Sequence, residues 1–137
     1  MTEAPPRLAL DTNVVLRYLV RDDAGQAERA RRLIESKREE VDRLFISWIV
    51  LCELAWVLHR TYGYPRRAVG LVVRGLLESR EVVVENEDAA GRALASYFAG
   101  RGGYADYLIR EAAQRARCAS VATFDTDLLP EPGFREP

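Results

Sequence analysis

The sequence predicts an α/β protein with three layers, in which helices cover both faces of a central, mainly parallel sheet of four to five strands. Short apolar runs of strand length alternate along the chain with longer segments of helical periodicity. Right-handed crossovers place the helices of such an alternation on both faces of a parallel sheet. The chain has 137 residues, 48% of them hydrophobic, and it contains no linker, repeat or low-complexity stretch. We therefore expect residues 1–137 to form a single domain.

The N-terminal half predicts two strands and four helices. An apolar run that ends in an acid predicts a strand at residues 7–11, and DRLFIS predicts another at 42–47. The segment ISWIVLCELAWVLHRTYG is almost entirely apolar and stops at Gly63, which indicates a mostly buried helix. Pro65 suits the first turn of the next helix because its fixed φ is already helical. The expected helices span about 13–20, from the turn RDDAG to about Arg38, 46–63, and 66–79.

The C-terminal half continues the alternation. EVVVEN predicts a strand at 81–86 and SVATF predicts one at 120–124, while GFRE predicts a weak edge strand at 133–136. Helices are expected at about 87–99 and 104–117, because the breaker run GRGG separates two helical segments. No segment is left over for a second domain.

Charge and composition narrow the setting. The net charge is -1, from 20 basic and 21 acidic residues, so no overall positive field favours nucleic acid or a membrane surface. The start of the chain lacks a signal-peptide pattern, and no apolar run reaches the roughly 18 residues of a spanning helix. We expect a soluble cytoplasmic protein with no membrane partner. Cys52 and Cys118 show no metal-type spacing and are expected to be reduced thiols.

Four acidic signatures stand at the end or in the middle of apolar stretches: Asp11 in LALDTN, Glu53 in WIVLCELAWVL, Asp106 in GGYADYLI, and Asp125 in SVATFDTDL. Removing a carboxylate from water costs several kcal/mol or more unless a partner compensates. The chain has one Lys, and no Arg stands beside Asp11, Glu53 or Asp125, so a divalent cation is the natural partner. Asp11 and Asp125 follow strands, and the carboxyl ends of parallel strands share one edge, where ligands bind.

Each signature also has an ordinary structural explanation. Glu53 lies on an apolar helix with no polar face to join, so it is expected to be buried, where it could also pair with Arg17 or Arg110 from another helix. Asp106, in the first turn of a helix, could serve only as a cap. Residues of the DTN and TFDTD type are common in strand-to-helix turns, where their side chains bind backbone amides.

Taken together and in order, the four signatures carry a resemblance to PIN-domain nucleases that covers nearly the whole chain. LALDTN is similar to the N-terminal strand that ends in Asp followed by Thr or Ser, and ISWIVLCELAWVL is similar to the acid-bearing helix after the second strand. ADYLI is similar to the late helix that an Asp opens, and TFDTDL is similar to the Thr-x-Asp after the fourth strand. The chain most closely resembles the VapC toxins of bacterial and archaeal type II toxin–antitoxin pairs. The resemblance implies a PIN-like, Rossmann-like fold.

The resemblance also implies a role for each polar residue of the signatures. The catalytic and metal-binding acids carry over to Asp11, Glu53, Asp106 and Asp125, with Asp11 and Asp106 the more direct ligands. Glu53 and Asp125 bind through water, or orient and deprotonate the nucleophile. Supporting polar positions carry over to Thr12, Asn13 and Thr123, whereas Asp127 is either an accessory acid or an exposed turn residue.

The implied activity is Mg²⁺-dependent hydrolysis of RNA phosphodiester bonds. Converging carboxylates repel one another unless a cation or protons intervene, and Mg²⁺, or Mn²⁺ in its place, accepts an all-oxygen ligand set. Because such a pocket repels phosphate, neighbouring cations must guide the RNA backbone, and the candidates are Arg17, Arg21, Arg101 and Arg110.

The implied partners are a second copy of the chain and a small VapB-like antitoxin whose C-terminal segment covers the toxin. The two helices between about residues 46 and 79 carry many large apolar side chains, which form either a groove for that segment or ordinary core: Trp48, Trp56, Tyr62, Tyr64, Val69 and Leu76.

Other classes of protein fit less well. A phosphatase of related fold needs a second Asp two residues after Asp11, where Asn13 stands, and a receiver domain needs an acidic pair and a late Lys, whereas the only lysine is Lys37. Two alternatives within the fold stay open, a PIN nuclease of housekeeping RNA processing and a non-catalytic binding module.

Overall fold

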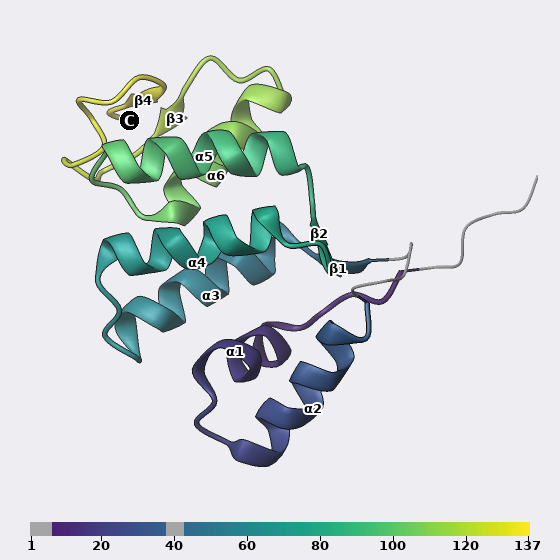
Figure 1. Cartoon of the computed structure of the whole chain (residues 1–137). Helices are drawn as coiled ribbons and strands as arrows, with labels where there is room; N and C mark the ends of the chain where they lie inside the picture. Colours follow the sequence, from purple (N-terminus) through teal and green to yellow (C-terminus); the bar gives the residue numbers. More distant parts are fainter. Residues whose placement is uncertain (1–6, 38–42) are drawn as a thin grey trace, which may run out of the picture. The chain divides into compact units, whose positions relative to one another are not determined.

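A computed structural model describes residues 7–37 and 43–137, which form two compact units, Met1–Glu87 and Asp88–Pro137. We call them unit 1 and unit 2 and describe each by itself (Figure 1). The candidate acids divide between them, because Asp11 and Glu53 belong to unit 1, whereas Asp106 and Asp125 belong to unit 2.

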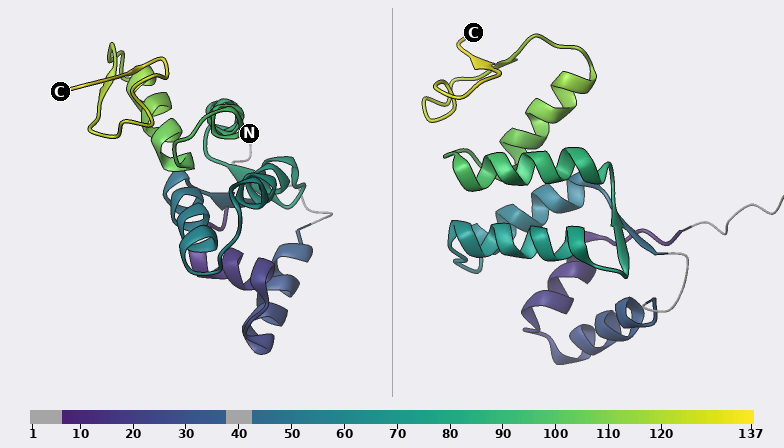
Figure 2. Two further views of the ribbon diagram at one scale, coloured as in Figure 1. Left: turned by 90° about the vertical axis from the view of Figure 1, so that its left-hand side faces the viewer. Right: turned by 45° about the horizontal axis from the view of Figure 1, so that its top comes forward.

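Unit 1 contains four helices and two strands in its described residues. Helices α3 and α4 run side by side in Figure 1 and in both views of Figure 2. Helices α1 and α2 form a hairpin, in which Arg21 caps α1 in the left-handed conformation with φ 58. In chain order the elements are α1 (Thr12–Val20), α2 (Ala24–Glu35), β1 (Leu44–Ile46), α3 (Trp48–Arg60), α4 (Arg66–Glu78) and β2 (Val82–Val84).

The sheet of unit 1 is short and parallel. Strand β1 pairs with β2 in the register Leu44 to Val82, and the side chains of Leu44 and Ile46 are fully buried. The predicted strand at 7–11 is reduced to a single bridge, Ala9 to Phe45. That bridge rests on two backbone hydrogen bonds, from the Leu10 amide to the Phe45 carbonyl (2.9 Å) and from the Phe45 amide to the Leu8 carbonyl (2.8 Å). The extended segment before Asp11 therefore still lies against β1.

Local capping explains where the helices of unit 1 begin. The Asp23 carboxylate accepts the Gln26 amide at 3.0 Å at the start of α2, and the Ser47 hydroxyl accepts the Val50 amide at 3.3 Å at the start of α3. Each bond satisfies an amide that has no partner inside the first helical turn.

Unit 2 contains two helices and two short strands. They are α5 (Glu87–Ala99), α6 (Tyr104–Arg115), β3 (Val121–Ala122) and β4 (Phe134–Arg135), and β3 pairs with β4 in parallel. Its core is rich in tyrosine, and its buried side chains include Tyr97, Tyr104, Tyr107, Leu108 and Leu128.

The predicted helices agree with the structure to within a few residues, and α5 has the predicted bounds of 87–99. The strands are shorter than predicted, and the described residues form two two-stranded parallel sheets, so the central sheet of four to five strands is not confirmed. The predicted helix end near Arg38 and strand start at Asp42 lie outside the described residues. No helix in the described chain is both long and apolar enough to cross a bilayer.

Candidate functional site

The two acids of unit 1 are joined by one threonine. The Thr12 amide donates to Asp11 Oδ1 at 2.8 Å, and the Thr12 hydroxyl donates to Glu53 Oε2 at 2.7 Å. Thr12 is itself buried, with 6% of its surface exposed. A β-branched residue held in this way has little rotamer freedom, so it fixes the two carboxylates relative to each other.

Helix starts explain this arrangement. Asp11 has extended backbone angles (φ -76, ψ 159) and is the N-cap of α1, so Thr12 is the first helical residue. Glu53 lies in the second turn of α3, which begins directly after β1. Because the segment before Asp11 pairs with β1, the start of α1 is brought beside α3.

Glu53 is exposed, which corrects the expectation that it is buried on an apolar helix. Two of its apolar neighbours on the same face are themselves in solvent, Ile49 at 70% and Trp56 at 62% exposure. The apolar residues around Glu53 in the sequence therefore did not indicate that its side chain is buried. The alternative pairing with Arg17 is also wrong, because Arg17 donates to Asp22 at 3.2 Å and to Gln26 at 2.7 Å.

Oxygen atoms remain for a cation in unit 1. Thr12 occupies Asp11 Oδ1 and Glu53 Oε2, and the second oxygen of each carboxylate accepts no hydrogen bond within the described residues. Two carboxylates with an accessible oxygen each match the one or two direct protein ligands that Mg²⁺ usually takes.

Asp106 caps its own helix. Its Oδ2 accepts the Gly103 amide at 2.8 Å, and its backbone amide donates to the Gly103 carbonyl at 3.0 Å. The predicted capping role is therefore present. A metal role is compatible with it, because only one carboxylate oxygen is used and the side chain is half-buried.

Asp125 sits in a chain of local turns. Its amide donates to the Thr123 hydroxyl at 3.0 Å, and its Oδ1 accepts the Asp127 amide at 2.9 Å. Its carbonyl accepts the Leu128 amide at 3.1 Å. Asp127 contributes its backbone to this turn, while its carboxylate is exposed and lies 3.9 Å from an Arg101 nitrogen.

The structure thus joins Asp11 with Glu53 and leaves the other acids in local turns. Within the described parts of each unit, no three His, Cys, Asp or Glu side chains cluster as a metal site would. Asn13 is exposed and lines a hollow of about 480 Å³ between α1 and α2, together with Arg17 and Arg29.

The arginines that were predicted to guide RNA already have partners. Arg17 is bound to Asp22 and Gln26, and Arg21 lies over the Tyr18 ring at 5.9 Å. Arg110 donates to the Pro132 carbonyl and to the Ser96 hydroxyl, each at 2.8 Å. The sole histidine, His59, bonds through Nδ1 to the Tyr64 carbonyl at 2.9 Å.

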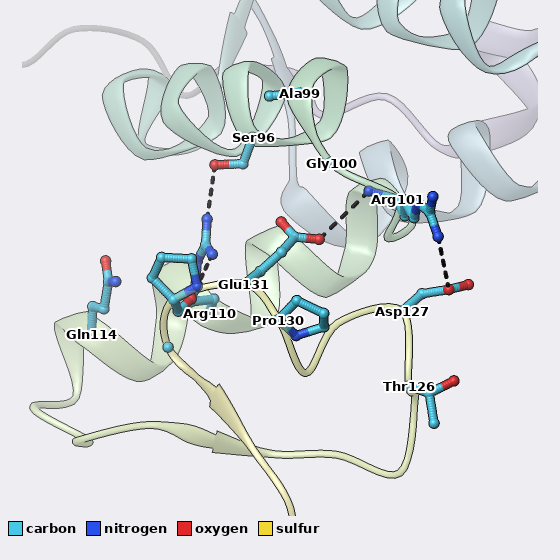
Figure 3. A pocket seen from close by; sticks show the side chains of 12 residues that line it. Ser96, Ala99, Gly100, Arg101, Arg110, Gln114, Thr126, Asp127, Pro130 and Glu131 are labelled. Atoms are coloured by element: carbon cyan, nitrogen blue, oxygen red, sulfur yellow. Dashed lines mark hydrogen bonds and ion pairs between the residues drawn. The ribbon is translucent and has the colours of Figure 1, made fainter.

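Two polar residues of unit 2 were missed by the sequence analysis. The buried Tyr107 hydroxyl accepts the Gly102 amide at 2.9 Å and donates to Glu131 at 2.8 Å. We call residues 123–133, between β3 and β4, the C-terminal loop. Beside the pair is a hollow of about 690 Å³ between the end of α5, the middle of α6 and this loop (Figure 3). No sequence signal marks the pair, because a tyrosine in a helix resembles core and a glutamate in a loop resembles surface.

Comparison with known families defines the class to which these features belong. The short parallel strands and the helices between them are those of an α/β fold. The PIN domain family matches residues 8–133, and the chain belongs to that family. PIN domains are generally metal-dependent nucleases that use Mg²⁺ or Mn²⁺ and bind RNA. No curated protein matches the chain at a significant level.

Proposed function

We propose that this protein is a Mg²⁺-dependent ribonuclease that hydrolyses RNA phosphodiester bonds, with residues 1–137 acting as one PIN domain. The metal-binding acids are Asp11, Glu53, Asp106 and Asp125, as the family pattern implies. The observation that carries the proposal is the link from Asp11 through Thr12 to Glu53. It holds together two acids far apart in the sequence, each with an oxygen left for a ligand.

The donor set fits the ion that the family uses. Carboxylate oxygens are the ligands that Mg²⁺ and Mn²⁺ prefer, and the Thr12 hydroxyl holds Glu53 without using its second oxygen. When bound, the ion supplies charge neutralisation at the phosphate and activation of the attacking water. Asp11 and Asp106 would hold the ion most directly, while Glu53 and Asp125 would hold it through water, or orient and deprotonate the attacking water. Thr12 holds the Asp11 and Glu53 carboxylates, the Thr123 hydroxyl accepts the Asp125 amide, and the Asp127 amide donates to Asp125 Oδ1. Asn13 is a further supporting position, as the family pattern implies.

The biological role that we propose is that of a VapC-type toxin, a cytoplasmic enzyme that inhibits translation when released from a VapB-like antitoxin. Ile49 and Trp56 are exposed on the same face of α3 as Glu53, and an antitoxin segment that covered them would also cover the acid. A homodimer or a toxin–antitoxin hetero-oligomer is the expected assembly. Among the predicted groove residues, Val69 is buried in the core and does not contribute to such a surface.

The first test is cleavage of mixed RNA by the purified chain with Mg²⁺, with Mn²⁺ and with EDTA. We expect cleavage with either ion, none with EDTA, and a loss of about a hundredfold or more in Asp11→Asn. Asn keeps the oxygen that accepts the Thr12 amide, so the cap of α1 and the fold are retained.

Circular dichroism and the unfolding midpoint of Asp11→Asn serve as controls for that fold. Cleavage at the wild-type rate by a folded Asp11→Asn protein would reject the proposed site. A folded, metal-binding wild type that cleaves no RNA would favour the binding-module alternative. If the chain cleaves RNA and no neighbouring reading frame encodes a small DNA-binding protein, the result would favour a nuclease of housekeeping RNA processing.

A further inference from the structure

The C-terminal loop of unit 2 is hydrogen-bonded to α6 through a buried hydroxyl. Tyr107 is fully buried, and its hydroxyl accepts the Gly102 amide at 2.9 Å while it donates to Glu131 Oε2 at 2.8 Å. A phenol has one proton to donate, so this chain of bonds has a fixed direction from Gly102 through Tyr107 to Glu131. In a buried position such a chain is stronger than the same bonds in water.

Arg110 makes a second set of contacts between α6 and the same loop. It lies three residues after Tyr107 on the same helix, so the two side chains share a face of α6. Its guanidinium donates to the Pro132 carbonyl at 2.8 Å and lies 5.3 Å from the centre of the Phe134 ring. Gly133 has φ +88, and a Cβ there would lie 2.7 Å from Arg110 Cδ. Figure 3 shows Arg110 between α5 and the loop that carries Pro130 and Glu131.

Close packing leaves the loop little room to move against the segment before α6. A Cβ on Gly100 would overlap the Tyr107 hydroxyl, and it would lie 2.6 Å from Glu131 Oε1. A Cβ on Gly102 would lie 2.5 Å from a methyl group of Leu128, a side chain that is 2% exposed. These contacts are possible only because both positions are glycine.

Both candidate acids of unit 2 are connected by backbone hydrogen bonds to the segments that Tyr107 and Glu131 hold together. The Gly102 amide binds Tyr107, and the next amide, of Gly103, binds Asp106. On the other side, the Asp125 carbonyl accepts the amide of Leu128, whose carbonyl accepts the amide of Glu131. The turn that holds Asp125 and the start of α6 that holds Asp106 are therefore connected through Tyr107 and Glu131.

We propose that Tyr107 and Glu131 are positioning residues, whose hydrogen bond sets the Asp125 turn relative to Asp106 at the start of α6. This proposal rests on the proposed function in so far as the two acids bind metal. Tyr107→Phe removes the hydroxyl, and with it the bond to Glu131 and the acceptor of the Gly102 amide, while it keeps the ring against Phe134.

The matched control is Tyr104→Phe. Tyr104 lies one turn earlier on α6 and is 2% exposed, and its hydroxyl donates to the Ala90 carbonyl on α5 at 2.9 Å. Tyr104→Phe also removes a buried tyrosine hydroxyl, but the bond that it loses does not involve the C-terminal loop. Both variants lose stability, so only effects specific to the loop or to metal separate them.

The first readout is hydrogen exchange of the metal-free full chain. We expect Tyr107→Phe to speed exchange of the amides at 125–131 by about tenfold, which corresponds to about 1.4 kcal/mol, and Tyr104→Phe to leave them unchanged. Glu131→Ala should also speed exchange of these amides, because it removes the same bond together with the acceptor of the Arg101 amide. The double variant should fall short of the sum of the two single variants, since the bond between Tyr107 and Glu131 is lost in both.

The second readout is Mn²⁺ binding by electron paramagnetic resonance, with Asp125→Asn in the same series. We expect the dissociation constant to rise about tenfold in Tyr107→Phe and to stay near wild type in Tyr104→Phe. Equal effects of the two tyrosine variants on exchange, or no effect of Tyr107→Phe on it, would overturn the positioning role. If exchange responds but Mn²⁺ binding does not, Tyr107 holds the loop without positioning a ligand, and the proposal is likewise overturned.

Failure of the proposed function has a different signature. In that case Asp125→Asn binds Mn²⁺ as the wild type does, and the proposed metal role of Asp125 is rejected whichever way the exchange data fall.

Discussion

The two units hold their candidate acids in different ways. In unit 1, the Thr12 amide donates to Asp11 and the Thr12 hydroxyl donates to Glu53, so one buried residue connects an adjacent carboxylate with one that is 41 residues away. In unit 2, Asp106 and Asp125 each close a turn of their own backbone. Unit 1 therefore holds Glu53 by a side chain from a distant segment, whereas the other three acids are held by nearby backbone amides.

The largest expected effect tests whether unit 2 contributes to catalysis at all. Asp125→Asn should lower RNA cleavage about a hundredfold at saturating Mg²⁺, because the amide keeps the turn oxygen that accepts the Asp127 amide but loses the charge. Single-turnover cleavage rates measure this effect.

Asp127→Asn is the matched control, since its carboxylate is exposed and only its backbone joins the turn. We expect its rate to stay within about twofold of wild type. A large loss in Asp127→Asn would make Asp127 the accessory acid, and equal activity of both variants would confine the site to unit 1.

The second prediction concerns the hydrogen bond from the Thr12 hydroxyl to Glu53 in unit 1. Thr12→Val has nearly the shape of threonine but no hydroxyl, so Glu53 loses its donor while the Asp11 cap remains. We expect a loss of about tenfold to a hundredfold in metal affinity, the usual effect of removing a residue that orients a ligand. The Mg²⁺ concentration for half-maximal cleavage measures it.

Thr12→Ser keeps a hydroxyl that can reach Glu53 and should stay within a few-fold of wild type. The direct bond is the cause only if Ser and Val differ. A loss in Thr12→Ser as large as that in Thr12→Val would mean that the buried methyl group, which valine keeps and serine lacks, matters as much as the hydroxyl. The bond to Glu53 would then not explain the effect by itself.

The sequence predicted the helices better than the strands. The end of α5 was predicted because the GRGG run separates it from α6. Strand β3, predicted at 120–124, is reduced to Val121–Ala122, because only these two residues pair with β4, Val121 with Phe134 and Ala122 with Arg135. The hydrophobic pattern of a segment predicts that it is extended, but the number of backbone hydrogen bonds that the segment makes depends on its partner strand.

The candidate site was predicted as a set of residues and not as a set of contacts. Thr12 was named as a supporting position, yet its bond to Glu53 spans 41 residues and has no local pattern. Tyr107 and Glu131 were missed for the same reason, since their bond spans 24 residues. Glu53 was expected to be buried, but the apolar residues beside it are exposed. Side-chain contacts between distant segments depend on tertiary packing, which composition does not encode.

The smallest expected effect contrasts two bonds between a tyrosine and a carboxylate. Tyr107 donates to Glu131 in the core of unit 2, whereas Tyr62 donates to Asp22 at 2.8 Å on the surface of unit 1. The hydrogen bond to Asp22 raises the pKa of Tyr62 above its usual value of 10.0, because ionisation would break the bond and place two negative charges together.

A folded-state pKa above the unfolded one means that the bond stabilises the protein fully below about pH 10, and that this stabilisation is lost as the pH rises through the pKa of Tyr62. Wild type should therefore be slightly more stable than Tyr62→Phe at neutral pH, and the difference should vanish in strong alkali. Urea unfolding at a series of pH values measures it. Tyr64→Phe is the control on the same turn, since the Tyr64 hydroxyl has no hydrogen bond within the described residues, and its difference from wild type should not follow the same pH course. A difference between wild type and Tyr62→Phe that is independent of pH would show that the ring, and not the bond to Asp22, stabilises this surface.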